Sequence, residues 1–166
     1  MRRICVAGVV LGVALIAALA GAGSAAAKPP THETLPPFEG PGVIDCGSFQ
    51  DNFVDFFTGT ATTFYDGKDE PVRIVQHVEH HSNDVNSETG LTIHEHGHFT
   101  FTVDLIAETV TITGNQEVAN RPKVGVVVQD VGRLVFDSND NLLFFAGGRK
   151  HSELFGGDQV LCDALS

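Results

Sequence analysis

The fold is decided by residues 72–103, which contain two alternating segments, VRIVQHVEHHS (72–82) and LTIHEHGHFTFTV (91–103). Successive side chains of a β-strand point to opposite faces. One face of the first segment therefore carries Val72, Ile74 and Val78, and one face of the second carries Leu91, Ile93, Phe99, Phe101 and Val103. Burying both apolar faces together predicts an antiparallel hairpin with residue 77 near residue 96, residue 79 near residue 94, and a loop at residues 83–90.

The opposite face of this hairpin gathers six side chains of types that bind metal ions: His77, Glu79, His81, His94, His96 and His98. Directly opposed residues lie about 4.5–5.5 Å apart at Cβ, so neutral imidazoles there are able to bind one zinc or copper ion. Two alternatives stay open, namely a patch in which crowded imidazolium groups respond to acid pH and a solvated face without a ligand. His80 falls on the apolar face near the hairpin end, where we expect a rim residue.

The remaining segments are also rich in β-branched and aromatic residues and are separated by turn residues. We expect strands at 43–46, 53–65, 109–113, 124–128, 133–136 and 142–146, with a turn at Gly114-Asn115. Short connections favour a meander of antiparallel neighbours. The predicted fold is all-β, an antiparallel meander of about eight strands that closes into a barrel, with a sandwich as the alternative. A short helix after Asp158, or a last strand, ends the chain.

Two cysteines, Cys46 and Cys162, lie near opposite ends of this predicted domain. The third cysteine, Cys5, lies within the first 27 residues, which we expect to be cleaved as a signal, and the even number that remains in the exported chain predicts a disulfide. A bond that closes so long a loop stabilises the fold by about 4–5 kcal/mol in the loop-entropy model. A metal-binding or catalytic thiol is less favoured, because neither cysteine has a ligand-spaced Cys or His beside it.

The first 27 residues are typical of a secretory signal peptide, with Arg2-Arg3, an apolar run from Ile4 to Ala20, and small residues before Lys28. A membrane span is the alternative, but the small residues favour cleavage. We therefore expect secretion to the extracellular side, with no stable membrane span after cleavage. Residues 28–42 hold five of the seven prolines and predict an extended tether. Residues 43–166 are then a single domain.

The charge of the chain disfavours nucleic acid and anionic membrane surfaces as partners. The net charge is −11, and residues 1–27 include two of the ten basic residues and no acid, so 8 basic and 21 acidic residues remain after cleavage.

Residues 137–141 resemble the start of a calcium loop, but Leu142 stands where that loop needs glycine, and we expect a hairpin turn. The sequence has no Gly-x-Ser-x-Gly elbow and no phosphate or dinucleotide loop.

Several features together resemble small exported bacterial single-disulfide β-barrel proteins of unknown function: the signal, Asp45-Cys46, the segment from Gly132 to Asp137, and Leu161-Cys162. The expected architecture is also similar to lipocalin-like and allene-oxide-cyclase-like barrels. We expect a secreted, non-enzymatic module without a cofactor, whose Phe-rich interior binds a small apolar ligand. The alternatives are a zinc- or copper-binding protein that uses the histidine hairpin, and a cyclase or isomerase with His77 and Glu79 at the barrel mouth.

Overall fold

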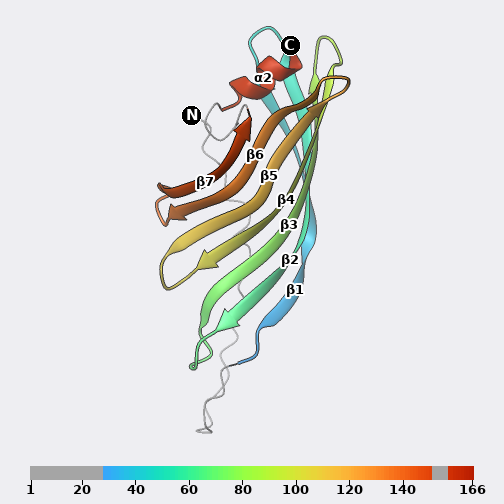
Figure 1. Cartoon of the computed structure of the whole chain (residues 1–166). Helices are drawn as coiled ribbons and strands as arrows, with labels where there is room; N and C mark the ends of the chain where they lie inside the picture. Colours follow the sequence, from blue (N-terminus) through green and yellow to red (C-terminus); the bar gives the residue numbers. More distant parts are fainter. Residues whose placement is uncertain (1–27, 151–156) are drawn as a thin grey trace.

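A computed structural model describes residues 28–150 and 157–166 of this chain, and the predicted signal at residues 1–27 lies outside them. The described residues form one antiparallel sheet of seven strands, in the order β1 to β7, and one short helix. The elements are β1 (Thr31–Asp45), β2 (Gln50–Tyr65), β3 (Pro71–Asn86), β4 (Thr92–Asp104), β5 (Thr109–Arg121), β6 (Gly125–Asp137), β7 (Leu142–Lys150) and α2 (Gln159–Leu165) (Figure 1). The all-β antiparallel meander is therefore confirmed.

The sheet is open, because β1 and β7 each have one neighbouring strand among the described residues. It has seven strands where we expected about eight and a closed barrel. The predicted strands 124–128 and 133–136 are one continuous strand, β6, and β5 runs through the turn predicted at Gly114-Asn115. Gly114 and Gly132 have φ of +125° and +149°. Glycine adopts such angles without steric cost, so these residues bend the strands instead of ending them.

The segment predicted as a tether is paired with β2 from residue 31 onward. Its backbone is extended, as the prolines suggested, but it forms the edge strand β1. The pairing with β2 is interrupted between Leu35 and Phe38, where Pro36 and Pro37 lie. Proline lacks an amide donor, and edge strands and bulges are the places in a sheet that tolerate it.

In the central hairpin, the apolar residues of β3 and β4 share one face as predicted, but the register between the two strands is shifted by four residues. His77 lies opposite Thr100, Glu79 opposite His98, and His81 opposite His96. The shift arises because β3 continues to Asn86, past the predicted loop start at residue 83. The side-chain oxygen of Asn86 accepts hydrogen bonds from the amides of Glu88 and Thr89 at 2.8 and 2.9 Å, which closes the turn there.

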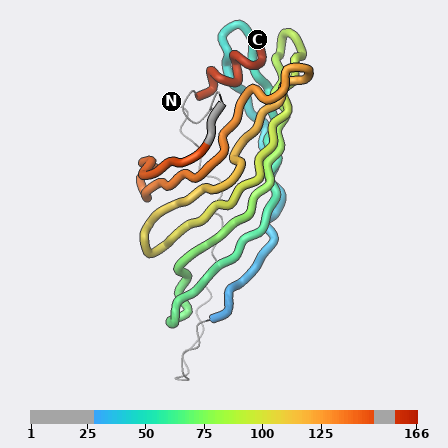
Figure 2. Tube along the Cα trace, viewed as in Figure 1, coloured from blue at the N-terminus to red at the C-terminus, as the bar shows by residue number. Residues whose placement is uncertain are grey.

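Helix α2 lies at the end of the sheet that carries the β1–β2, β3–β4 and β5–β6 turns (Figures 1 and 2). It completes a small core whose buried members are Ile44, Ile93, Ala119, Val128, Leu161, Cys162 and Leu165. We call the sheet face that carries Ile93, Ala119 and Val128 the inner face, and the opposite one the outer face. The structure confirms the predicted C-terminal helix and the Cys46–Cys162 disulfide, whose Cα atoms are 5.4 Å apart.

Aspartates at the strand ends set several of the turns. The carboxylate of Asp66 accepts hydrogen bonds from the amides of Lys68 and Glu70, which lower its pKa from 3.8. The side-chain amide of Asn141 and then the backbone amides of residues 141 and 139 lower the pKa of Asp137 in the same way. The segment at 137–141 is thus the predicted hairpin turn. No helix among the described residues is long and apolar enough to cross a bilayer.

Candidate functional site

The six predicted metal-binding residues lie together on the outer face. His77, Glu79, His81, His94, His96 and His98 are all exposed, three on β3 and three on β4. The predicted sharing of one face is therefore correct. The face points to solvent rather than into a pocket, which favours the alternative of a solvated surface.

The outer contacts are mostly between pairs of side chains. His98 Nδ1 is 3.7 Å from Glu79 Oε1, and these side chains are 73% and 59% exposed. His94 Nδ1 lies 2.6 Å from Asn83 Oδ1, and His77 Nδ1 lies 3.0 Å from Thr100 Oγ1. Two of the histidines are thus paired with an amide or a hydroxyl group. Metal binding by the outer six residues stays a prediction.

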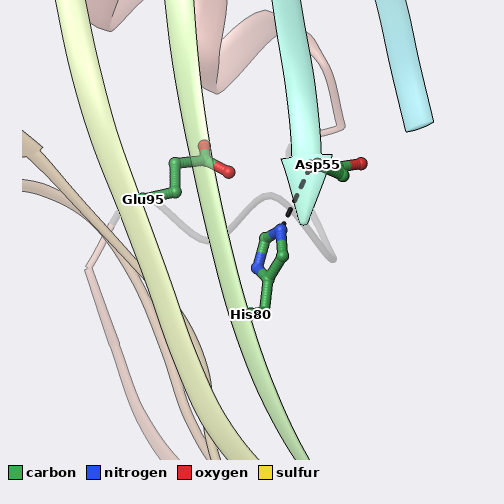
Figure 3. A group of neighbouring side chains, drawn as sticks. All are labelled: Asp55, His80 and Glu95. Carbon is green, nitrogen blue, oxygen red and sulfur yellow. Dashed lines mark hydrogen bonds and ion pairs between the residues drawn. The ribbon is translucent and has the colours of Figure 1, made fainter. Parts of the chain in front are cut away.

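A different cluster forms on the inner face, where ligand-type atoms of Asp55, His80 and Glu95 lie within 4.8 Å of one another (Figure 3). The three residues come from the adjacent strands β2, β3 and β4. Asp55 and Glu95 are both register partners of Ser82, one from each side. His80 is two residues along β3 from Ser82, on the same face. Its side chain therefore lies on the same face as the two carboxylates and close to both.

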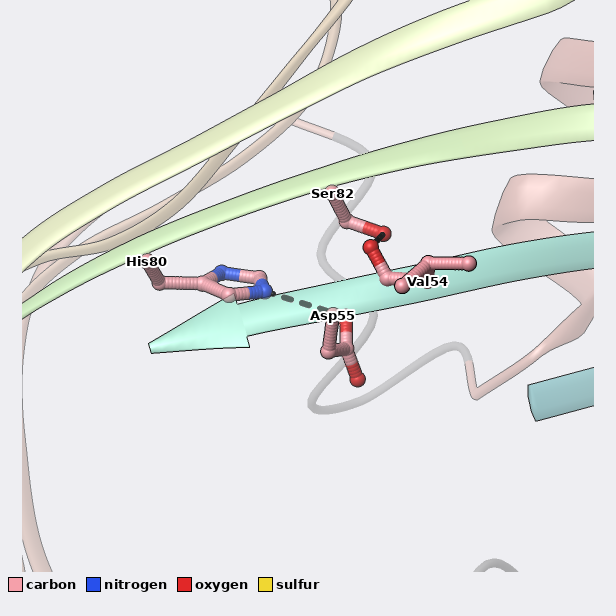
Figure 4. A network of polar contacts seen from close by, with 4 residues as sticks. All are labelled: Val54, Asp55, His80 and Ser82. Carbon is pink, nitrogen blue, oxygen red and sulfur yellow. Dashed lines mark hydrogen bonds and ion pairs between the residues drawn. The ribbon is translucent and has the colours of Figure 1, made fainter. Parts of the chain in front are cut away.

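The imidazole of His80 is held on two sides. Its Nε2 lies 3.1 Å from Asp55 Oδ1, a distance at which an N–H group donates to a carboxylate. Its ring stacks on Phe57, with centroids 4.4 Å apart and planes inclined by 15°. Beside it the Ser82 hydroxyl donates to the carbonyl of Val54 at 3.2 Å (Figure 4), which adds a bond between β2 and β3. The contacts with Asp55 and Phe57 fix the orientation of the His80 ring.

The cluster borders a pocket of about 240 Å³ on the inner face. Its apolar lining is Ile44, Phe53, Phe57, Phe99, Ile112 and Leu161, and its polar lining is Asp55, His80, Asp84, Glu95, Gln116 and Glu117. His80 and Glu95 are each only 8% exposed, and Asp84 is 2% exposed. The pocket lining thus combines apolar and acidic side chains with one imidazole.

This arrangement can hold a polar group or move a proton. The Nε2 atom of His80 lies at hydrogen-bond distance from Asp55, and histidine is the side chain that most often transfers protons in active sites. A carboxylate at hydrogen-bond distance orients such a ring. The ionisable groups beside the pocket are therefore not His77 and Glu79, which the enzyme alternative placed at a barrel mouth, but residues of the other face.

Asp55 and Glu95 were not predicted as site residues, and His80 was expected at the rim, whereas His80 is buried and bonded to Asp55. A signal was present in the alternation itself. Glu95 interrupts the apolar series of Ile93 and Phe99, and Asp55 interrupts Phe53 and Phe57. Charged residues are rarely buried without a partner. Polar interruptions of a buried face were therefore better indicators of a site than the larger exposed group of histidines.

No protein-family model, curated protein sequence or solved structure matches this chain. The resemblance to small exported single-disulfide barrels therefore stays a prediction, and the site is interpreted from its own geometry.

Proposed function

We propose that this protein is an exported, non-enzymatic module that binds a small, mainly apolar ligand in the inner pocket. The observation that carries the proposal is the pocket lining, in which Phe53, Phe57 and Phe99 are joined by polar groups that include His80. Ligand pockets are mainly apolar with a few fixed polar groups. A volume of about 240 Å³ is below the roughly 300–1,000 Å³ typical of drug-sized ligands, so the ligand is a small one.

Export is supported by the disulfide between Cys46 and Cys162, because such bonds persist in oxidising compartments and are rare in the cytosol. The order of charge, apolar run and small residues at 1–27 supports it independently. Together they favour a ligand that is met outside the cytoplasm.

We also propose that the sheet closes further around the ligand, toward the barrel predicted from the sequence. Both edge strands carry exposed apolar side chains: Phe38 and Val43 on β1, and Leu142, Leu143 and Phe144 on β7. Unpaired strand edges and exposed apolar groups are costly in water. Bringing β1 and β7 together would cover both. Slower hydrogen exchange of the edge-strand amides when ligand is added checks this closure.

The test of ligand binding uses the neutral fluorescent probe N-phenyl-1-naphthylamine. We expect saturable binding to the wild-type chain and at least a tenfold loss of affinity for Ile112→Asn, because Ile112 lines the pocket and the polar amide that replaces it has to be desolvated when the probe binds; a tenfold loss corresponds to about 1.4 kcal/mol. Ile106→Asn is the matched control, since Ile106 is 77% exposed in the β4–β5 turn.

Circular dichroism establishes that both variants are folded. Failure of the wild-type chain to bind the probe would refute the proposal. Equal affinities of Ile112→Asn and wild type would place the bound probe elsewhere and would also refute it.

A further inference from the structure

We propose that Asp55, His80 and Glu95 form a binding site for one divalent transition-metal ion, with Zn²⁺ as the best-fitting probe. The ligands are one carboxylate oxygen from each acid and one ring nitrogen of His80. The site lies in the same pocket as the proposed ligand, but it stands whether or not an apolar ligand binds. It is distinct from the predicted histidine site on the outer face.

The spacing of the three groups suits a metal ion. Bond lengths of about 2.0–2.2 Å in a tetrahedral zinc site place neighbouring ligand atoms about 3.4 Å apart. His80 Nε2 and Asp55 Oδ1 are 3.1 Å apart, and all three ligand atoms lie within 4.8 Å of one another. Glu95 has two rotatable bonds between Cβ and its carboxylate, so a small rotation brings its oxygen into range.

The pairing of β2, β3 and β4 brings the three ligand side chains together. Strands lie about 4.7–4.9 Å apart, so Asp55 and Glu95 begin two strand spacings from each other on either side of β3. Their ligand-type oxygen atoms and a ring nitrogen of His80 nevertheless lie within 4.8 Å of one another, and Figure 3 shows the three side chains on the three adjacent strands. The residue opposite His80 on β4 is Gly97, which has no side chain to occupy this space.

Burial distinguishes this group from the outer histidines. His80 and Glu95 are each 8% exposed, and the His80 ring is held against Phe57. Metal binding here fixes few additional rotamers, whereas the exposed outer side chains lose much of their freedom on binding. Orientation of a histidine ligand by packing and neighbouring groups is a regular feature of metal sites.

The charge of the pocket also favours a cation. Four of its described lining residues are acids, Asp55, Asp84, Glu95 and Glu117, against one imidazole. A divalent ion is often the largest local charge in a site, and it stabilises ionised carboxylates near it. Asp84 and Glu117 are placed to act on the ion through space rather than as ligands.

The ligand set selects the class of ion. Imidazole suits zinc, copper, iron and nickel, whereas carboxylates also suit manganese, and calcium prefers six to eight oxygen atoms. One nitrogen with two carboxylate oxygens therefore fits Zn²⁺ and, more weakly, Mn²⁺. Three protein ligands leave a fourth position open, the arrangement of zinc sites that hold water or a ligand atom.

The test is isothermal titration of the metal-free full chain with Zn²⁺, with His80→Gln and Glu95→Gln as site variants. Both substitutions keep the side-chain size close to the original. The matched control is His94→Ala combined with His96→Ala on the outer face. We expect one zinc ion per wild-type chain, at least tenfold weaker binding in each site variant, and unchanged affinity in the control.

Three outcomes would overturn the proposal: no zinc binding by wild type, unchanged affinity in His80→Gln, or loss confined to the outer control. If a site variant fails to fold, NMR of the wild-type chain with Mn²⁺ decides. Preferential broadening of the His80 ring signals supports the site, and broadening of the His96 and His98 rings refutes it. Uptake of the naphthylamine probe by metal-free protein is measured separately, so ligand binding and metal binding can fail independently.

Discussion

Asn86 joins two distant parts of the chain through one buried amide. Its oxygen accepts hydrogen bonds from Glu88 and Thr89 in the β3–β4 turn, and its nitrogen donates to the carbonyl of Leu165 at 3.0 Å. Arg121 donates to the neighbouring carbonyl of Ala164 at 3.1 Å. The last carbonyls of a helix lack partners within the helix, so these two side chains satisfy the end of α2.

At the residue scale, we predict that Asn86→Ala lowers the free energy of unfolding by about 2–3 kcal/mol. The substitution removes three hydrogen bonds and leaves the carbonyl of the fully buried Leu165 without its donor. Urea unfolding measures the loss. Asn139→Ala is the matched control, because Asn139 is exposed in the β6–β7 turn, and we expect a change within about 0.5 kcal/mol.

Asn86→Asp separates the two roles of the amide. It keeps an oxygen for the turn but replaces the donor to Leu165 with a second acceptor. We expect it to destabilise the protein while the amide protons of Glu88 and Thr89 stay protected from exchange. Stability equal to wild type in both variants would mean that the bond to α2 contributes nothing.

Part of the arrangement of these side chains was predictable from the sequence. Alternation correctly gave the common face of His77, Glu79 and the four other outer residues. It could not give the cluster of Asp55, His80 and Glu95, because that depends on which strands are adjacent and on their register. Asp55 lies on a strand that the sequence did not align with the hairpin. The register of the hairpin itself was wrong by four residues, since the turn chemistry of Asn86 was not recognised.

At the element scale, a row of glycines crosses three strands and shapes the sheet. Gly114 on β5 is the register partner of Gly132 on β6, which is the partner of Gly147 on β7. A Cβ atom on Gly132 would lie 2.3 Å from the carbonyl oxygen of Ala146 and 2.6 Å from the Cα of Gly147. The absence of side chains lets the backbones approach and bend, as the curved strands in Figure 2 show.

We predict that Gly132→Ala destabilises the protein by at least about 2 kcal/mol. The φ of +149° is unfavourable for alanine, and the added methyl group meets backbone atoms that cannot rotate away. Urea unfolding is again the measurement. Gly67→Ala is the control, because no atom lies within 4 Å of a Cβ there. Similar unfolding midpoints for the two variants would show that the close approach at Gly132 is not needed.

The same row explains why strand number was the least predictable part of the fold. Glycine beside a polar residue is typical of turns, so the sequence predicted a turn at Gly114-Asn115, and it predicted separate strands at 124–128 and 133–136, on either side of a segment that contains Gly132. Within a strand, glycine produces a bulge or bend instead. Local composition does not distinguish the two. The direction of the strands, by contrast, followed from short connections and was predicted correctly.

At the scale of the whole molecule, the sheet is held at one end by α2 and the disulfide, while the described parts of β1 and β7 remain edges. The core is small for a seven-stranded sheet, and three of its buried residues, Leu161, Cys162 and Leu165, belong to α2. Residues near the start and end of the described chain therefore stabilise the same region. A helix of seven residues has little stability alone, so its position depends on packing and on the covalent link.

We predict that replacing both Cys46 and Cys162 by serine lowers the free energy of unfolding by about 4–5 kcal/mol, since the bond joins residues 116 positions apart and restricts the unfolded chain. Such a loss is a large part of the roughly 5–15 kcal/mol that stabilises a typical domain. Both proteins are compared in urea in a Cys5→Ser background, so that no other thiol exchanges. Because α2 carries part of the core, we expect local unfolding of the double serine variant to begin in α2. Its amides at residues 159–165 then exchange faster than those of β3 and β4. Uniform exchange across the sheet and helix would instead mean that α2 is held by its packing alone.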